Sequence, residues 1–171
     1  MRKPLIALIA ALFLVISVQA TLAQSETTGT TSENSSVFTA WQPFQFGVML
    51  WFQDTDQIWV LTSNRTTDND SGDELATGSG TYTVYTDNFS GDGDSTASSG
   101  SCERAPVRGF GQVWSSLGGD SASIGCPLAG EIGYDTGGRV GSGSSVEFLG
   151  PGNTRYSINT GDNGWSTISY D

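Results

Sequence analysis

The chain of 171 residues carries 18 acidic residues against seven basic ones and contains no histidine. A surface this acidic repels phosphate backbones, which argues against nucleic acid as a partner. The missing histidine excludes Ser-His-Asp and Cys-His catalysis and the usual zinc ligand sets. Paired carboxylates are the catalytic route that remains, with Glu103, Glu131, Glu147 and Asp135 as candidates, although surface solubility is the preferred explanation for such residues.

The first 23 residues have the layout of a secretory signal peptide. Arg2 and Lys3 precede an apolar run over residues 4–18, and small residues follow up to Ala23. The run is short for a bilayer span, which needs about 20 apolar residues, so cleavage after Ala23 is preferred to an uncleaved membrane anchor. We therefore expect a secreted protein at an extracellular or cell-surface location, with no stable membrane insertion after cleavage.

Cleavage would leave five basic residues, all of them arginines, against the 18 acids, a net charge of −13. Residues 24–36 are polar and of low complexity, which predicts a disordered leader. The remainder, 37–171, predicts a single β-rich domain. It divides into a first unit over about 37–89 and a second over about 102–171.

The densest apolar stretch after the signal peptide, residues 46–64, predicts a β-hairpin. With a turn at residues 54–56, Trp51 would lie opposite Trp59, and Leu50 opposite Val60. One face would then be aliphatic and form the core, and the other would be either covered by another layer or exposed for binding. The two predicted faces are Phe46, Val48, Leu50, Phe52, Ile58 and Val60, and Met49, Trp51, Trp59 and Leu61.

Residues 81–89 alternate in the manner of a β-strand. By contrast, Phe110, Val113, Trp114 and Leu117 follow helical spacing and predict a short helix over 109–117 that covers one apolar face of the sheet. The fold class is therefore mainly β, with antiparallel hairpins in a small sheet and one short helix.

The chain has two cysteines, Cys102 and Cys126. An even pair in an exported protein predicts a disulfide, which would close a loop of roughly 25 residues and stabilise the fold by about 3 kcal/mol. Two free thiols or a metal-binding pair are the alternatives.

Two loops rich in oxygen ligands, residues 68–74 and 92–103, are candidate calcium sites, and the second matches a known spacing. Asp92, Asp94, Thr96 and Glu103 occupy positions 1, 3, 5 and 12 of a calcium-loop pattern. Position 6 is Ala97 instead of glycine and no flanking helices are predicted, so a solvated loop is the alternative reading. Calcium is the only cofactor that the sequence suggests.

A faint internal repeat links residues 43–63 with 145–165, where a turn at 150–153 joins two strands. Between these stretches lies a motif made of Ile124, Gly125, Pro127, Glu131, Gly137, Gly138 and Arg139. This motif resembles the LGFP-type repeats of secreted bacterial proteins. Cys126 departs from that pattern, which usually has a large residue at this position. The resemblance implies two degenerate repeat units and association with the cell envelope.

These features together predict an exported, non-catalytic module that associates with the cell envelope or with extracellular polysaccharide. Flat sugar faces pack on aromatic rings, so Trp51, Trp59 and Trp165 are the carbohydrate-stacking candidates, with plain core packing as the alternative for each. A small carboxylate-dependent hydrolase of the glycosidase type and a structural protein-interaction module are the competing functions.

Overall fold

The computed structural model describes residues 36–63, 78–91 and 97–168. The predicted signal peptide, the predicted leader up to residue 35, the loop over residues 68–74, and the loop residues Asp92, Asp94 and Thr96 lie outside these ranges. Within the described ranges, no helix has the length and apolar character needed to cross a membrane.

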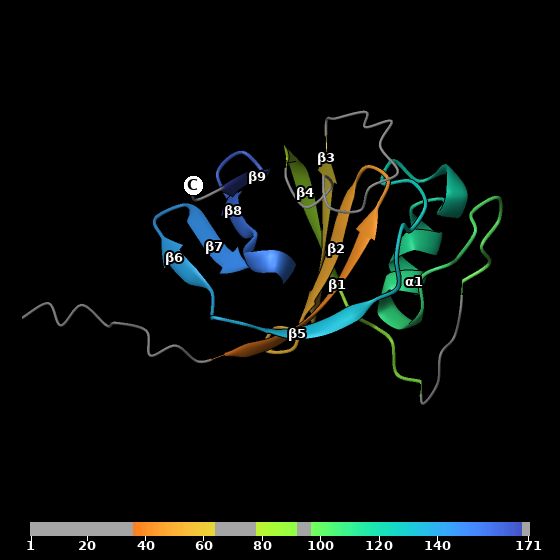
Figure 1. Ribbon diagram of the computed structural model, residues 1–171, viewed down its shortest axis with the longest axis horizontal. Helices are drawn as coiled ribbons and strands as arrows, with labels where there is room; N and C mark the ends of the chain where they lie inside the picture. Colours follow the sequence, from red (N-terminus) through yellow and green to blue (C-terminus); the bar gives the residue numbers. More distant parts are fainter. Residues whose placement is uncertain (1–35, 64–77, 92–96, 169–171) are drawn as a thin grey trace, which may run out of the picture. The chain divides into compact units, whose positions relative to one another are not determined.

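Nine antiparallel strands form one sheet, which confirms the mainly β fold class (Figure 1). Their order is β5-β1-β2-β3-β4-β9-β8-β7-β6, so strands of both predicted units join the same sheet. The repeat relationship between the two units stays a prediction. The strands are β1 (Val37–Phe44), β2 (Gly47–Phe52), β3 (Gln57–Ser63), β4 (Ser79–Thr86), β5 (Ile132–Thr136), β6 (Val140–Ser142), β7 (Ser145–Leu149), β8 (Arg155–Asn159) and β9 (Gly164–Ile168).

The two edge strands of this sheet, β5 and β6, follow one another in the chain with only residues 137–139 between them. Each residue extends a chain by at most about 3.6 Å, so the facing ends of the two edges lie close together. The sheet therefore curls into a half-barrel, and one of its faces becomes the inside of the curl.

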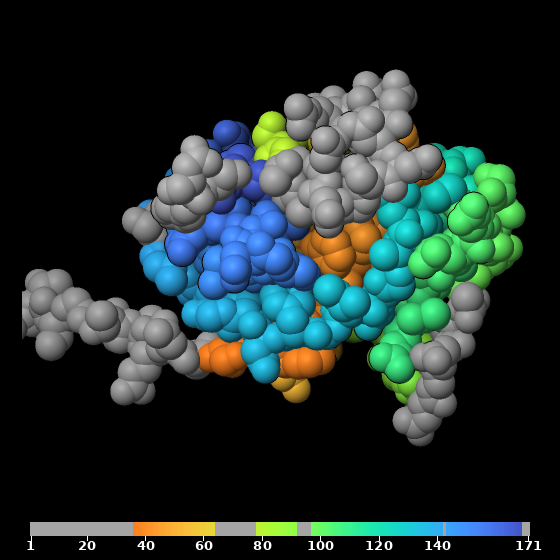
Figure 2. Space-filling model, viewed as in Figure 1, coloured from red at the N-terminus to blue at the C-terminus, as the bar shows by residue number. Residues whose placement is uncertain are grey.

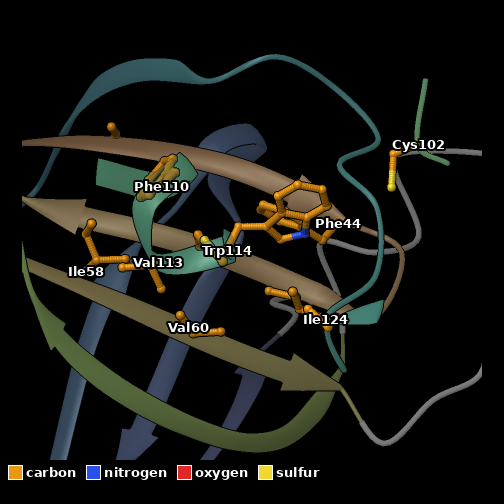
Figure 3. Packing of buried hydrophobic residues seen from close by; sticks show 11 residues of the cluster. Phe44, Ile58, Val60, Cys102, Phe110, Val113, Trp114 and Ile124 are labelled. Atoms are coloured by element: carbon orange, nitrogen blue, oxygen red, sulfur yellow. The ribbon is translucent and has the colours of Figure 1, made fainter. Parts of the chain in front are cut away.

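Helix α1 (Arg108–Ser116) covers the outer face of β1 to β3, as predicted for residues 109–117 (Figure 3). Phe110, Val113 and Trp114 project from the helix and are buried against the strands. We call the resulting cluster the helix-side core. Its fully or nearly buried members are Ala40, Phe44, Met49, Ile58, Val60, Cys102, Phe110, Val113, Trp114, Ala122 and Ile124.

A second cluster, the inner core, fills the inside of the curl. Strands β7 to β9 fold back so that Phe148 packs edge-on against Phe52, with ring centroids 5.1 Å apart. The β2–β3 hairpin is therefore covered on both faces, by α1 on one and by β7 to β9 on the other. Only part of either face can contact a ligand. The inner core contains Trp41, Val48, Leu50, Phe52, Trp59, Leu61, Phe148, Tyr156, Ile158 and Trp165.

The predicted hairpin register is wrong by one residue. Trp59 lies opposite Leu50, and Ile58 lies opposite Trp51. The turn contains four residues, 53–56, because Asp56 adopts a left-handed conformation (φ 52°) and its N–H donates to the Phe52 carbonyl at 2.9 Å. Since a slip of one residue exchanges the faces of a strand, β3 places Trp59 and Leu61 in the inner core and Ile58 and Val60 under the helix.

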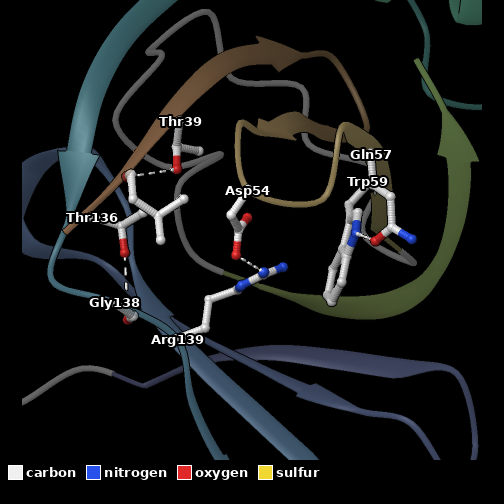
Figure 4. A network of polar contacts seen from close by, with 8 residues as sticks. Thr39, Asp54, Gln57, Trp59, Thr136, Gly138 and Arg139 are labelled. Atoms are coloured by element: carbon white, nitrogen blue, oxygen red, sulfur yellow. Dashed lines mark hydrogen bonds and ion pairs between the residues drawn. The ribbon is translucent and has the colours of Figure 1, made fainter. Parts of the chain in front are cut away.

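Arg139 connects the segment between the two edge strands, residues 137–139, to the β2–β3 turn. Its guanidinium forms an ion pair with Asp54 and lies 4.8 Å from the centroid of the Phe52 ring (Figure 4). Gly138 in the same link accepts a hydrogen bond from Thr136 Oγ1. These contacts keep the open side of the curl next to the β2–β3 turn.

Two single-turn 3-10 helices complete the described structure. One, Gly119–Ser121, follows α1, and the other, Pro151–Asn153, joins β7 to β8 within the predicted turn at 150–153.

Candidate functional site

A cleft of about 380 Å³ opens on the helix-covered face, at the end of the sheet where β2 turns into β3. In Figure 2 the teal surface of the segment that follows α1 lies against the orange surface of β1 and β2. Strands form the floor, and the first turn of α1 and the segments after β4 and before β5 form the walls. The described residues that line the cleft are Phe38, Ala40, Trp51, Asp56, Ile58, Asp87, Phe89, Arg108, Gly109, Phe110 and Glu131.

Strand register explains the floor of the cleft. Ala40, Trp51 and Ile58 lie opposite one another on β1, β2 and β3, so their side chains share one face of the sheet. Gly133 of β5 lies opposite Ala40. The Phe38 ring packs over Gly133, since a Cβ at residue 133 would lie 2.6 Å from Phe38 Cζ. The small Ala40 and the Phe38 ring therefore form the side of the cleft next to the Trp51 indole.

Trp51 is the central aromatic residue of the cleft. Its indole is partly buried, and Nε1–H donates to Asp56 Oδ1 at 3.1 Å. The ring of Phe38, which is 43% exposed, meets the indole edge-on with centroids 6.4 Å apart. A fixed tryptophan beside an exposed phenylalanine offers a ligand an apolar wall with little conformational entropy to lose.

Asp87 forms one wall and ends β4. Its Oδ1 accepts a hydrogen bond from the Phe89 N–H at 3.0 Å, and its own N–H donates to the Asp56 carbonyl at 2.9 Å. This turn stops the strand at Thr86, so the predicted strand over 81–89 ends three residues too late, and it also begins two residues after the observed start at Ser79. Gly109 of α1 packs directly on the Asp87 carboxyl, because a Cβ there would lie 2.7 Å from Asp87 Cγ.

Arg108 begins α1 at the rim of the cleft in a left-handed conformation (φ 53°), which is uncommon for a residue with a side chain. Asp56, Asp87 and Glu131 add three carboxylates to the lining against this one arginine. Such a cleft provides acceptors for hydroxyl and amine donors and disfavours anionic groups.

The structure brings Trp51 alone of the three stacking candidates into this cleft. Trp59 is 7% exposed and Trp165 is 4% exposed, and both belong to the inner core. Trp59 stacks on Tyr82, and the Trp165 Nε1–H donates to the Thr62 carbonyl at 2.9 Å. Burial removes the free ring faces that carbohydrate stacking on these two residues requires.

The sequence pattern indicates little of the cleft. Glu131 belongs to the repeat motif and is a candidate carboxylate, whereas no motif or spacing indicates a site at Phe38, Asp56, Asp87, Phe89 or Arg108. The observed hairpin register is the signal that would indicate Asp56. In that register the turn has four residues and ends at Asp56, whose carboxylate lies next to Trp51.

The calcium prediction stays untested, because its first three ligands lie outside the described ranges. Glu103, the fourth, is exposed. No group of three or more acidic or cysteine side chains within the described residues is arranged to hold a metal ion, so the carboxylates of the cleft do not form a metal site.

The predicted disulfide between Cys102 and Cys126 is present, with Cα atoms 5.5 Å apart. Cys126 is also hydrogen-bonded through its backbone to Gln45 in the β1–β2 turn. The bridge therefore fixes the segment that leads into α1 against the sheet.

Comparison of the chain with protein-family models, curated proteins and solved structures finds no match. The resemblance to LGFP-type repeats accordingly rests on the sequence motif alone.

Proposed function

We propose that this protein is an exported, non-catalytic module that binds a neutral polysaccharide of the cell envelope or extracellular matrix. The observation that carries the proposal is the indole of Trp51, held by Asp56 and flanked by the exposed Phe38, in a cleft of about 380 Å³. Sugar-binding surfaces combine an aromatic wall with polar acceptors, because each sugar has an apolar face and a rim of hydroxyl groups.

Charge favours a neutral chain over an acidic one. Three carboxylate residues and one arginine line the cleft, and the whole chain has a formal net charge of −11. Uronates or phosphate-bearing wall polymers would meet repulsion both at long range and inside the cleft. Sugar hydroxyl groups, in contrast, donate hydrogen bonds readily to carboxylate oxygens.

Export supports an extracellular ligand. The signal-peptide layout of residues 1–23 and the Cys102–Cys126 disulfide are both typical of proteins that leave the reducing cytoplasm. The motif shared with LGFP-type repeats adds a cell-envelope location to this proposal.

Retention on purified envelope polysaccharide tests the proposal. Trp51→Ala should lower affinity about tenfold or more, as the loss of a central aromatic contact does in other interfaces. Trp51→Phe should keep part of the binding. Val140→Ala removes an exposed apolar side chain from β6, outside the cleft lining, and should bind like the parent protein. If Trp51→Ala bound the polysaccharide as tightly as the parent protein, the cleft would be excluded as the binding site.

A carboxylate-dependent hydrolase is the second candidate, because Asp56, Asp87 and Glu131 all line the same cleft. Two of these carboxylates hold structural hydrogen bonds, Asp56 to the Trp51 indole and Asp87 to the Phe89 amide, which favours binding over catalysis. Release of new reducing ends from the retained polysaccharide, abolished by Glu131→Gln, would favour the hydrolase.

A protein-interaction module, the third reading, predicts a different result in the same assay. The parent protein would then show no retention on polysaccharide from which proteins have been removed, and it would bind only when envelope proteins are present.

A further inference from the structure

A second hollow of about 490 Å³ runs along the seam between β4 and α1. It shares Asp87 and Gly109 with the cleft, so the two hollows meet at the first turn of the helix. The described residues that line it are Val84, Tyr85, Thr86, Asp87, Asn88, Gly109, Gln112, Val113 and Ser116.

The Asp87 carboxyl and the Gly109 backbone form the boundary between the two hollows. The Asp87 carboxyl rests on the helix backbone at this point, and a Cβ on residue 109 would occupy the same space. Asp87 is held there by the Phe89 amide and by its own bond to the Asp56 carbonyl. A ligand that leaves the cleft in this direction therefore passes over one fixed carboxylate.

Each hollow contains a partly buried aromatic residue that projects from a strand, and strand register aligns these two residues. Trp51 lies opposite Ile58, and Ile58 lies opposite Tyr85, so both rings project from the same face of β2 and β4. Neighbouring strands are about 4.8 Å apart, which separates the two positions by about 10 Å. Ile58 between them is 1% exposed and belongs to the helix-side core, so a ligand that contacts both rings passes Asp87 and does not cross Ile58.

The chemistry of the seam suits the same class of ligand as the cleft. Gln112 and Ser116 are exposed on α1, and Asn88 is exposed after β4. Their amides and hydroxyl group both donate and accept hydrogen bonds, as sugar hydroxyl groups do. Asp87 is the one charged residue among the described residues of this lining.

We infer that the cleft and the seam form one extended site, in which a neutral polysaccharide lies with internal sugar units on Trp51 and Tyr85. This inference rests on the proposed function and adds to it that the protein recognises an internal stretch of the chain, not a single sugar or a chain end. Occupation of two linked subsites raises affinity without any change at either one, because the second contact becomes intramolecular.

The test is a length series of β-1,4-linked glucose and N-acetylglucosamine oligomers, from disaccharide to octasaccharide, titrated calorimetrically into the parent protein. Affinity should rise by about tenfold or more at the length that first reaches both subsites, and then level off. An affinity that is the same for all binding oligomers would overturn the inference while leaving the proposed function intact. Failure of every oligomer to bind would overturn both.

Variants separate the two subsites. Tyr85→Ala and Gln112→Ala should each remove the increase with length and leave binding of the shortest binding oligomer unchanged, whereas Trp51→Ala should weaken binding at all lengths. Tyr82→Ala is the matched control on the same strand, because Tyr82 packs against the inner core on the opposite face. Ser115→Ala is the control on α1. Loss of short-oligomer binding in the folded Gln112→Ala variant would contradict two separable subsites.

Discussion

Leu50 lies directly opposite Trp59 across the β2–β3 hairpin, and both side chains are buried in the inner core. Leu50→Ala should therefore lower the free energy of unfolding by about 2–4 kcal/mol, and Trp59→Ala by about 3–5 kcal/mol, because each leaves a cavity. Denaturant unfolding of the two variants measures both values.

Val140→Ala serves as the control, since Val140 is 59% exposed and its truncation should change stability by less than about 0.5 kcal/mol. A Trp59→Ala variant as stable as the Val140→Ala variant would contradict the register described above.

The strands of the 46–64 hairpin, the strand after residue 80 and the helix could be predicted from residue pattern because local periodicity determines them. Phe110, Val113 and Trp114 follow helical spacing, and the helix begins at Arg108, within one residue of the prediction. The disulfide likewise could be predicted from an even number of cysteines together with a predicted signal peptide.

The hairpin register could not be predicted in the same way, because β3 is apolar on both faces. Exchanging Ile58 and Val60 with Trp59 and Leu61 leaves each face apolar, so the hydrophobic pattern does not choose between the two registers. The left-handed conformation of Asp56 decides the turn length, and an aspartate in a polar turn does not reveal it beforehand.

The cleft depends on contacts between distant segments. Asp87, Glu131 and the start of α1 meet at Trp51 only after β4, α1 and β5 have taken their places around the hairpin. No sequence spacing predicts that these segments come together. Residue type alone does not predict the stacking residue either, because two of the three candidate tryptophans, Trp59 and Trp165, are core residues.

Loss of the Cys102–Cys126 disulfide should destabilise the protein by about 3 kcal/mol, given the separation of 24 residues. A Cys102→Ser/Cys126→Ser double variant, compared with the parent by denaturant unfolding, measures this effect. Because the bridge fixes the segment leading into α1, hydrogen exchange should increase in residues 97–107 more than in β7 and β8. Alkylation of both cysteines in the folded, unreduced parent would contradict the bond.

Gly109→Ala sets two effects against each other. Helix propensity alone would make alanine more stable than glycine by up to about 1 kcal/mol. A Cβ at this position, however, would lie 2.7 Å from Asp87 Cγ, so the carboxyl must move out of its hydrogen bond with Phe89. We expect net destabilisation together with weaker polysaccharide binding.

Gly130→Ala is the control for this substitution, because no atom lies within 4 Å of a Cβ placed there. Thermal unfolding and retention on polysaccharide are measured for both variants. A more stable Gly109→Ala variant with unchanged binding would show that Asp87 does not depend on the absence of a side chain at residue 109.

Tyr156 should make the fold sensitive to alkali. Its ring is fully buried, its hydroxyl oxygen accepts a hydrogen bond from Trp41 Nε1 at 3.3 Å, and burial raises its pKa from 10.0 to about 12. The unfolded chain therefore loses this proton first as pH rises. The stability that Tyr156 contributes is complete below pH 10 and is lost progressively up to about pH 12.

Burial also raises the pKa of the nearby Tyr134, so both phenols favour unfolding at high pH. Urea unfolding measured at intervals between pH 9 and pH 12 should show a falling free energy of unfolding. Tyr156→Phe should be less stable at neutral pH, because Trp41 loses its acceptor, but its stability should fall less steeply with pH. An identical slope in the parent and the variant would mean that Tyr156 ionises without unfolding, which its burial in the inner core argues against.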